Sequence, residues 1–155
     1  MKQIILYFTA LLLLFVACDK ECKIDRPKDV KPIDWENYND VYTVYWNLVH
    51  LSSEPINLQS DTIKITGWVR LPLYSMEGYF NLVENVSQAG KIPGSVSNPN
   101  IIVICPNSIR EYLDTCDLTR QCFIEGLLIF EEAPLKGCKK VPKIVITNVN
   151  DIYLK

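Results

Sequence analysis

The residues of this chain best suited to chemistry are its six cysteines, because thiols bind metal ions, form disulfides and accept covalent modification. The last four, Cys105, Cys116, Cys122 and Cys138, are separated by 10, 5 and 15 residues. Structural zinc sites are built on close pairs of the C-x₂₋₄-C kind, and these four contain none. The spacing therefore favours disulfides over a metal site, and we expect neither a metal ion nor a cofactor.

Other candidates for catalysis are few. His50 is the only histidine, and no nucleophile or carboxylate can be placed beside it to act with it as a base. Glu131-Glu132 is the only adjacent acidic pair, but neighbours on a strand point to opposite faces. The sequence contains no phosphate-binding glycine loop, calcium-binding loop or zinc motif. We therefore expect a protein that is not an enzyme.

The N-terminus carries a strong targeting pattern. After Lys2, an apolar run of 14 residues extends from Ile4 to Ala17 and ends at Cys18. Crossing a bilayer takes about 20 apolar residues, so the run is too short to span one. Its length suits the apolar core of a secretory leader, which is removed from the mature protein.

The segment Phe15-Val16-Ala17-Cys18 resembles the lipobox of bacterial lipoproteins, although that family usually has leucine where this chain has Phe15. The resemblance implies that residues 1–17 are removed and that Cys18 is acylated, which anchors the protein to a membrane. The following Asp19-Lys20-Glu21 resembles the export signals of Bacteroidota surface lipoproteins. It implies an outer-membrane lipoprotein at the periplasmic face or the cell surface; in enteric bacteria the same Asp19 would instead indicate inner-membrane retention.

The remaining 138 residues are enough for one domain. Residues 18–37, which are charged and carry prolines, read as a lipidated flexible tether, and residues 38–155 as the domain. Without Lys2, Lys+Arg falls from 16 to 15 against 18 Asp+Glu, a net charge of about −3. Nucleic-acid binders need a basic surface, so we expect no nucleic-acid partner. An oxidising envelope permits disulfides, and of the five cysteines left after Cys18, Cys22 is the natural unpaired one.

Several segments of the domain have the two-residue period of strands. Thr62–Leu71 is the clearest, with alternating apolar and polar residues. Val41–Leu51 fits both a strand and a helix, and its β-branched and aromatic content favours a strand. We expect further strands at Tyr79–Asn85, Ile101–Cys105, Gln121–Phe130 and Lys143–Leu154, a short helix at Ile109–Thr115 and a long loop from Val86 to Asn100.

This order of strands and helix resembles an OB-fold, including the anticodon-binding type and OB-like envelope lipoproteins. The resemblance implies an all-β domain: a small five-stranded Greek-key barrel with one short helix and, here, an extra N-terminal strand. Gly67 and Gly126 would be the points where long strands bend to close the barrel. An immunoglobulin-like sandwich is the alternative, but it needs about seven strands. The segments that carry the resemblance are Thr62–Val69, Gly78–Leu82, Ile101–Cys105, Cys122–Gly126 and Ile144–Val149.

The OB resemblance also implies a cysteine pairing. In that barrel the third strand pairs with the fifth, which brings Cys105 and Cys138 to one end. Cys116 and Cys122 flank the connection from the helix to the fourth strand, at the other end. The implied disulfides are therefore Cys105–Cys138 and Cys116–Cys122.

The usual ligand surface of OB domains is the face of the second and third strands with two neighbouring loops. Aromatic and arginine side chains there could stack on a sugar or anchor a protein. Trp68 could instead only pack against the N-terminal strand or the long loop. The ligand surface would comprise Trp68, Arg70, Tyr74, Tyr79 and Asn81, with Lys136, Lys139 and Lys140 from the late loop.

Separately, Asp61-Thr62-Ile63 resembles an O-glycosylation acceptor of Bacteroidota envelope proteins.

The function that best fits these features is a membrane-anchored envelope lipoprotein that acts as a non-catalytic binding module for a protein or a glycan. The alternative is a structural accessory subunit of an envelope complex that has no small ligand.

Overall fold

The structure, a computed structural model, describes residues 27–51, 61–73, 78–93, 96–97, 99–131 and 141–155. Within these residues one eight-stranded sheet is accompanied by two α-helices and two 3₁₀ helices. In chain order the elements are β1 (Asn39–Asp40), α2 (Val41–Leu51), β2 (Thr62–Leu71), β3 (Tyr79–Val83), η1 (Val86–Gln88), β4 (Gly90–Lys91), β5 (Asn100–Ile104), α3 (Asn107–Asp114), β6 (Gln121–Glu131), β7 (Val141–Val145), η2 (Val149–Asp151) and β8 (Ile152–Leu154).

Five of these strands close into a barrel. The strand order is β1-β2-β3-β5-β7-β6-β8, and an additional pairing between β2 and β6 joins the sheet to itself. Within the ring β5 and β7 are parallel, and the other neighbours are antiparallel. This is the topology of an OB-fold, and it includes the expected pairing of the third and fifth barrel strands. The fold class predicted from the sequence is confirmed.

The two glycines expected at the bends lie where a strand changes partner. β2 pairs with β6 up to Trp68 and with β3 from Trp68 onward, directly after Gly67. β6 pairs with β2 up to Leu127 and with β7 from Leu127 onward, directly after Gly126. A Cβ at Gly67 would lie 2.7 Å from the Val83 carbonyl oxygen, so the absence of a side chain allows this close approach.

The expected N-terminal strand is wrong, because Val41–Leu51 forms the helix α2. Asp40 begins the helix: its side-chain Oδ1 accepts a hydrogen bond from the Thr43 backbone N–H at 2.6 Å. Val41, Val44 and Leu48 recur at helical spacing and are fully buried. The cap and this apolar stripe outweigh the strand preference of the β-branched residues, and only the two-residue β1 remains as an extra strand before the barrel.

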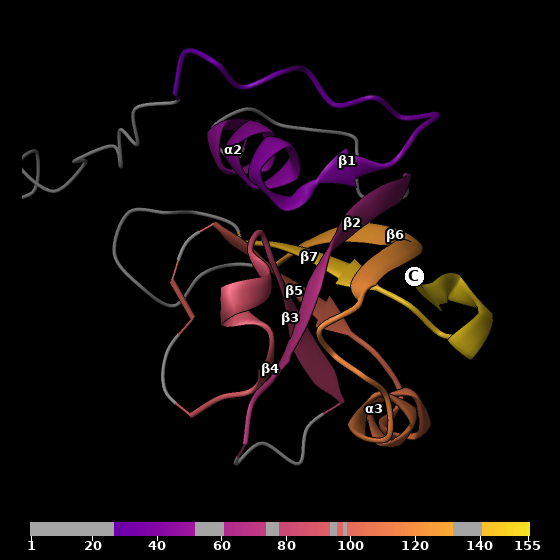
Figure 1. Cartoon of the computed structure of the whole chain (residues 1–155). Helices are drawn as coiled ribbons and strands as arrows, with labels where there is room; N and C mark the ends of the chain where they lie inside the picture. The colour runs from indigo at the N-terminus through magenta and orange to yellow at the C-terminus, as the bar shows by residue number, and fades with distance from the viewer. Residues whose placement is uncertain (1–26, 52–60, 74–77, 94–95, 98, 132–140) are drawn as a thin grey trace, which may run out of the picture.

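The two α-helices lie at opposite ends of the barrel (Figure 1). α2 contacts β2, β5 and β7 at one end. α3 lies at the other end, where the Arg110 guanidinium donates to the carbonyl oxygens of Tyr79 at 3.0 Å and Pro72 at 2.7 Å. Both openings of the small barrel are therefore covered by helices, and its interior is filled by side chains. None of the helices in the described residues is long and apolar enough to cross a membrane.

The expected last strand, Lys143–Leu154, is divided in two. β7 ends at Val145, and β8 begins only at Ile152. Between them lies the 3₁₀ helix η2, closed by a capping box between Asn148 and Asp151. This interruption moves β8 away from β7 to pair with the first part of β6.

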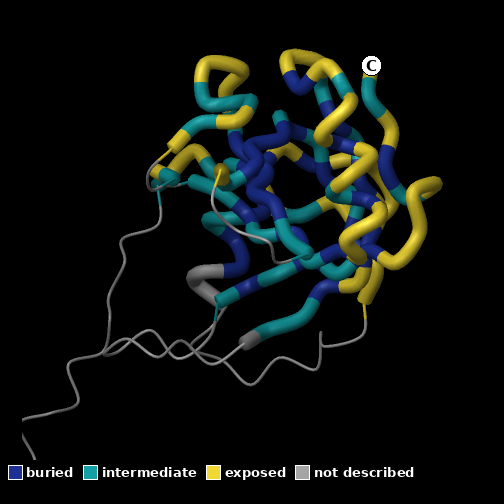
Figure 2. The backbone as a smooth tube through the Cα atoms, turned by 90° about the horizontal axis from the view of Figure 1, so that it is seen from below, coloured by how far each residue is buried: buried dark blue, intermediate teal, exposed yellow. Residues whose placement is uncertain are grey.

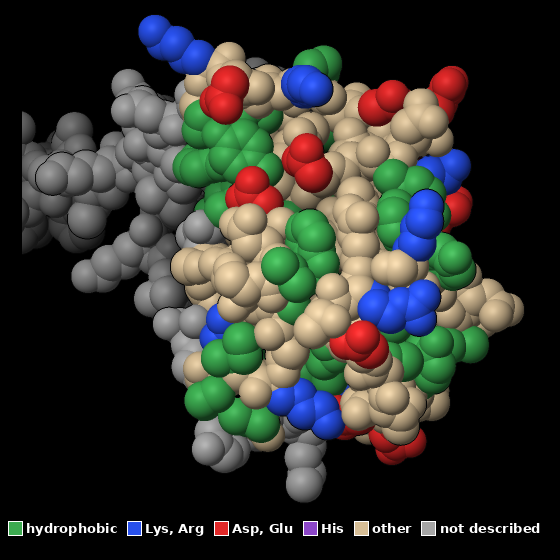
Figure 3. Space-filling view, in the orientation of Figure 1, with side chains coloured by type: hydrophobic (Ala, Val, Ile, Leu, Met, Phe, Trp, Pro, Cys, Tyr) green, Lys and Arg blue, Asp and Glu red, His purple; other side chains and the backbone are tan. Residues whose placement is uncertain are grey.

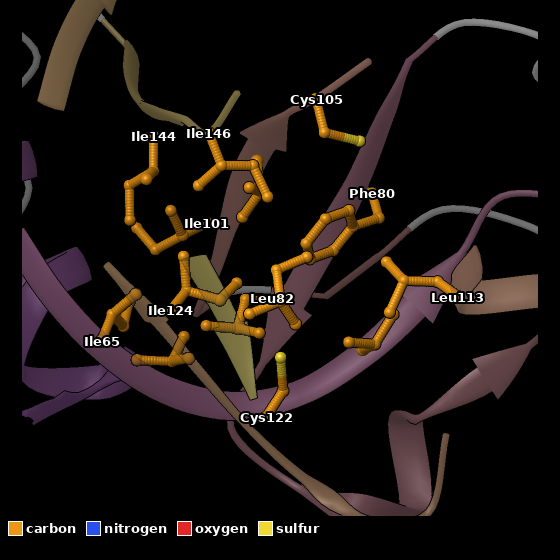
Figure 4. Packing of buried hydrophobic residues seen from close by; sticks show 14 of the residues in the cluster. Ile65, Phe80, Leu82, Ile101, Cys105, Leu113, Cys122, Ile124, Ile144 and Ile146 are labelled. Atoms are coloured by element: carbon orange, nitrogen blue, oxygen red, sulfur yellow. The ribbon is translucent and has the colours of Figure 1, made fainter. Parts of the chain in front are cut away.

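The core fills the barrel interior. It is built from inward-facing side chains of all five barrel strands and from α2 and α3, and it includes the thiols of Cys105 and Cys122 (Figure 4). Buried backbone is concentrated in the centre, and most exposed residues lie in the connections around it (Figure 2). Ile33 also packs against this core, so part of the segment expected as a tether lies on the domain.

Candidate functional site

The structure places the described residues of the sequence-predicted ligand surface on β2 and β3. Trp68 and Arg70 lie on β2, and Tyr79 and Asn81 on β3, with Arg70 directly opposite Asn81. Arg70 and Asn81 are each only 8% exposed. These two side chains point away from the core but are covered by other parts of the chain, so they are not exposed to a ligand, which corrects the expectation for them. A ligand-contacting role for Trp68 and Tyr79, both partly exposed, stays a prediction.

The long connection after β3 contributes to the burial of Arg70. Its short strand β4 pairs with β2 at Arg70 and Leu71. Further along, the Pro93 carbonyl oxygen accepts a hydrogen bond from the Arg70 guanidinium at 3.4 Å. The connection was expected to be a long loop, but it contains η1 and β4, and its Pro93 contacts Arg70. The other proposed ligand contacts, Tyr74, Lys136, Lys139 and Lys140, lie outside the described residues.

A different region of the barrel carries an open hollow. A hollow of about 470 Å³ lies on the outer face of β6, a volume within the range of known ligand pockets. Three aromatic side chains line it, two of which are strongly exposed: Tyr38 at 46% and Tyr153 at 61%. The complete lining is Tyr38, Thr62, Phe123, Glu125, Gly126, Leu127, Val145, Thr147, Asn150, Asp151 and Tyr153.

The sheet itself forms the hollow, because β6 has two successive neighbours along one edge. It pairs with β8 over Cys122–Ile124 and with β7 over Leu127–Glu131. Glu125 and Gly126 pair with neither of them, and the connection containing η2 joins the two partners around this gap. We call this region the β7–β8 fork. The alternation of β6 turns Cys122 and Ile124 into the core and Phe123, Glu125 and Leu127 outward to the hollow.

Tyr38 reaches the hollow from the segment before the barrel, and Asn39 holds it there. Asn39 is 6% exposed. Its side-chain oxygen accepts from the Asp34 N–H at 2.9 Å, and its amide nitrogen donates to the carbonyl oxygens of Asp34 at 2.7 Å and Lys64 at 3.3 Å. The segment is thus fastened to β2, and the Tyr38 ring lies against Phe123, with centroids 5.2 Å apart and planes at 89°.

The polar groups of the hollow come from both sides of the fork. Thr62 stands on β2, and Thr147, Asn150 and Asp151 come from the connection between β7 and β8. Asp151 also holds that connection in place, since its carboxylate accepts from the Asn148 N–H at 3.0 Å. Hydroxyl, amide and carboxylate groups therefore surround the aromatic rings. Thr62 is exposed, and its glycosylation stays a prediction.

Charge is not concentrated on the side of the molecule in Figure 3, where Lys and Arg are mixed with Asp and Glu and hydrophobic side chains reach the surface between them. Nor do the described residues contain a group of three or more His, Cys, Asp or Glu side chains that could hold a metal ion. His50 lies near the end of α2, not at the end of a strand as expected, and Glu132 lies outside the described residues.

The expected disulfides are not found. Cys105, Cys116 and Cys122 are free thiols, so the Cys116–Cys122 bond is wrong, and Cys138 lies outside the described residues. Cys122 points into the core and is fully buried, whereas the Cys116 thiol donates to the Tyr112 carbonyl oxygen at 3.3 Å. The argument from barrel topology predicted at which end of the barrel each cysteine lies, but it could not predict the direction in which each side chain points. Burial raises the pKa of the Cys105 thiol to about 11.

Sequence reasoning missed the aromatic members of the hollow, Tyr38, Phe123 and Tyr153. Phe123 carried a usable signal, since it is a large apolar residue on the outward face of a strand whose inward face is already apolar. Tyr38 and Tyr153 reach it only through the clamp at Asn39 and the pairing of β8 with β6. No local pattern in the sequence indicates those contacts.

Comparison with known proteins gives little further information. No protein-family model matches this chain, and no curated protein matches it. Among solved structures, it is similar to a chain assigned as an aspartyl-tRNA synthetase from Leishmania major Friedlin, with 11% identity and a TM-score of 0.41. The match covers 96% of this chain but only 26% of that chain. The fold assignment above rests on strand order and register.

Proposed function

We propose that this protein is a lipid-anchored, non-catalytic binding module of a bacterial cell envelope, held to the outer membrane through Cys18. Cys18 lies outside the described residues, and the support for its acylation is the lipobox-like end of the apolar leader. In this proposal the segment before the barrel links the lipid anchor to the barrel domain, and the outer surface of that domain is available to other envelope molecules. Its ligand is a protein or a glycan of the envelope.

The observation that carries the binding role is the cluster of exposed aromatic side chains around the hollow at the β7–β8 fork. Burying exposed apolar surface is favourable, so a protein rarely displays a group of large rings without a partner for them. Tyrosine also combines a broad apolar surface with a hydroxyl group, which is why it is common in binding sites. Tyr38 and Tyr153 are the most exposed members of the cluster.

Anchoring is tested by comparing the wild-type protein with Cys18→Ser after expression in a host that acylates lipoproteins. We expect wild-type protein to partition into the detergent phase and to carry the mass of acyl chains on Cys18. The Cys18→Ser variant should remain in the aqueous phase. An unmodified amino terminus on native protein would refute the anchor.

Binding is tested by cross-linking on intact envelopes with the full-length lipidated protein and two tyrosine variants. Tyr153→Ala removes a ring of the hollow, and Tyr112→Ala is the matched control because Tyr112 is 44% exposed but lies on α3. We expect cross-linked partners, protein or glycan, to decrease with Tyr153→Ala and to persist with Tyr112→Ala. If both variants capture the same material as wild type, the hollow is not the binding site.

A further inference from the structure

The charge of the hollow restricts what can occupy it. Two of its lining residues, Glu125 and Asp151, are acidic, and none of the described lining residues is lysine or arginine. Glu125 is exposed and accepts no hydrogen bond from the described part of the chain. Lys64 lies directly opposite Glu125 on β2 but is not part of the lining, and its ammonium donates to the Glu36 carbonyl oxygen at 3.2 Å. The two carboxylates of the lining therefore favour a cation over an anion, with the charge of Lys64 beside Glu125 acting against them.

The arrangement of the rings suits a cation as well. Phe123 meets Tyr38 at 89° and Tyr153 at 47°, with the second pair of centroids 6.2 Å apart. Tyr38 and Tyr153 leave much of their rings exposed beside Phe123, and the exposed face of such a ring attracts a cation. A planar guanidinium stacks on such a ring and at the same time donates to a carboxylate in its own plane.

We propose that the hollow at the β7–β8 fork binds an arginine side chain presented by a basic segment of a partner protein, with Glu125 as its carboxylate acceptor. This inference rests on the proposed binding function and narrows its ligand from protein or glycan to a cationic protein segment. Asp151 contributes negative charge at the rim, while its oxygen continues to hold the η2 connection. Tyr38 and Tyr153 enclose the guanidinium beside Phe123.

The test uses two peptides that differ only in charge. Acetyl-Gly-Arg-Gly-amide carries the guanidinium, and acetyl-Gly-citrulline-Gly-amide has nearly the same shape but is neutral. Each is titrated into the full-length lipidated protein in detergent micelles and followed by saturation-transfer difference NMR. We expect the arginine peptide to bind at least about tenfold more tightly than the citrulline peptide. Raising the salt concentration should weaken the arginine peptide only, because screening acts on charges.

Three variants locate the effect. Glu125→Gln should remove most of the preference for the arginine peptide, whereas Glu111→Gln, the same charge change at an exposed position on α3, should leave the preference intact. Tyr153→Leu keeps an apolar side chain but removes a ring, and it should reduce arginine binding severalfold. Circular dichroism of each variant confirms that the barrel is folded.

Two results would overturn the inference. Equal binding of the arginine and citrulline peptides by wild type would show that charge is not recognised. Binding of a neutral methyl glucoside, lost in Tyr153→Leu and without any arginine-peptide signal, would identify a sugar site; the proposed binding function would then stand with a different ligand. Failure of the proposed function is a separate result, namely unchanged cross-linking by Tyr153→Ala on intact envelopes.

Discussion

Two regions of the barrel carry outward-facing aromatic and charged side chains, and they have opposite fates. On β2 and β3, Arg70 and Asn81 are buried, and Arg70 is in contact with the connection that contains β4. At the β7–β8 fork, Phe123 and Glu125 remain on a surface that Tyr38 and Tyr153 border but do not close. Both regions follow the same strand alternation, in which every second residue points away from the core.

The difference between the covered face and the fork arises from the connections. After β3 the chain returns along β2 and adds β4 to its edge, and the Pro93 carbonyl oxygen beyond β4 accepts from the Arg70 guanidinium. After β7 the chain turns through η2 and pairs with a different part of β6, so a gap remains between two ladders. Binding surfaces on such a small barrel therefore depend on where connections leave a strand edge uncovered.

The largest expected effect concerns the floor of the fork. A Cβ at Gly126 would lie 2.5 Å from Ile144 Cγ2 and 2.9 Å from the Val145 carbonyl oxygen. Gly126→Val should therefore lower the free energy of unfolding by about 3 kcal/mol, because a branched side chain has no space there. Urea unfolding measures this change. Leu127→Val, at an exposed neighbouring position, is the control, and wild-type stability of Gly126→Val would show that the strands at the fork are loosely packed.

The covered face should respond to mutation as an interior region does. Arg70→Ala removes a buried side chain and its hydrogen bond to Pro93, so we expect a loss of about 2 kcal/mol in the free energy of unfolding. Capture of the partner on envelopes should not change in this variant. If Arg70→Ala instead lost cross-linking to the partner while keeping wild-type stability, the ligand site would lie on β2 and β3.

The strands could be predicted because burial of one strand face produces a two-residue period, which is plain in Thr62–Leu71. The barrel followed from the resemblance of the order of strands and helix to an OB-fold. α2 was missed because Val41–Leu51 satisfies both periods, and only the capping position of Asp40 separates them. The hollow could not be predicted, because it joins Tyr38, Phe123 and Tyr153 through contacts between distant parts of the chain. Coverage of Arg70 depends in the same way on one pairing of β4.

The buried thiols provide a test that does not depend on a ligand. Burial, together with the nearby Cys116 thiol, raises the pKa of Cys122 to about 12. Above the roughly 8.5 typical of an unfolded thiol, the unfolded state loses a proton that the folded state keeps, so stability falls as pH rises. From pH 7 to 9.5 this loss should be about 1.4 kcal/mol for Cys122.

Cys122→Ala should therefore lose about 1.4 kcal/mol less than wild type over that interval, whatever its stability at pH 7. Urea unfolding at several pH values under reducing conditions measures the two slopes. The same slope in both proteins would mean that Cys122 ionises as easily in the folded state as in the unfolded one. Thr115→Ala is the control, because this exposed hydroxyl just after α3 does not ionise over that interval.

The smallest expected effect on stability is at the fork, where the largest effect on binding is expected. Tyr153 is 61% exposed on the edge strand β8, so Tyr153→Ala should change the free energy of unfolding by less than about 0.5 kcal/mol. Thermal unfolding followed by circular dichroism measures it beside Arg70→Ala. If Tyr153→Ala were as destabilising as Arg70→Ala, the ring would be a structural support of β8. If Tyr153→Ala keeps near-wild-type stability but loses cross-linking to the partner, then the β7–β8 fork serves binding, in contrast to the face of β2 and β3, which serves stability.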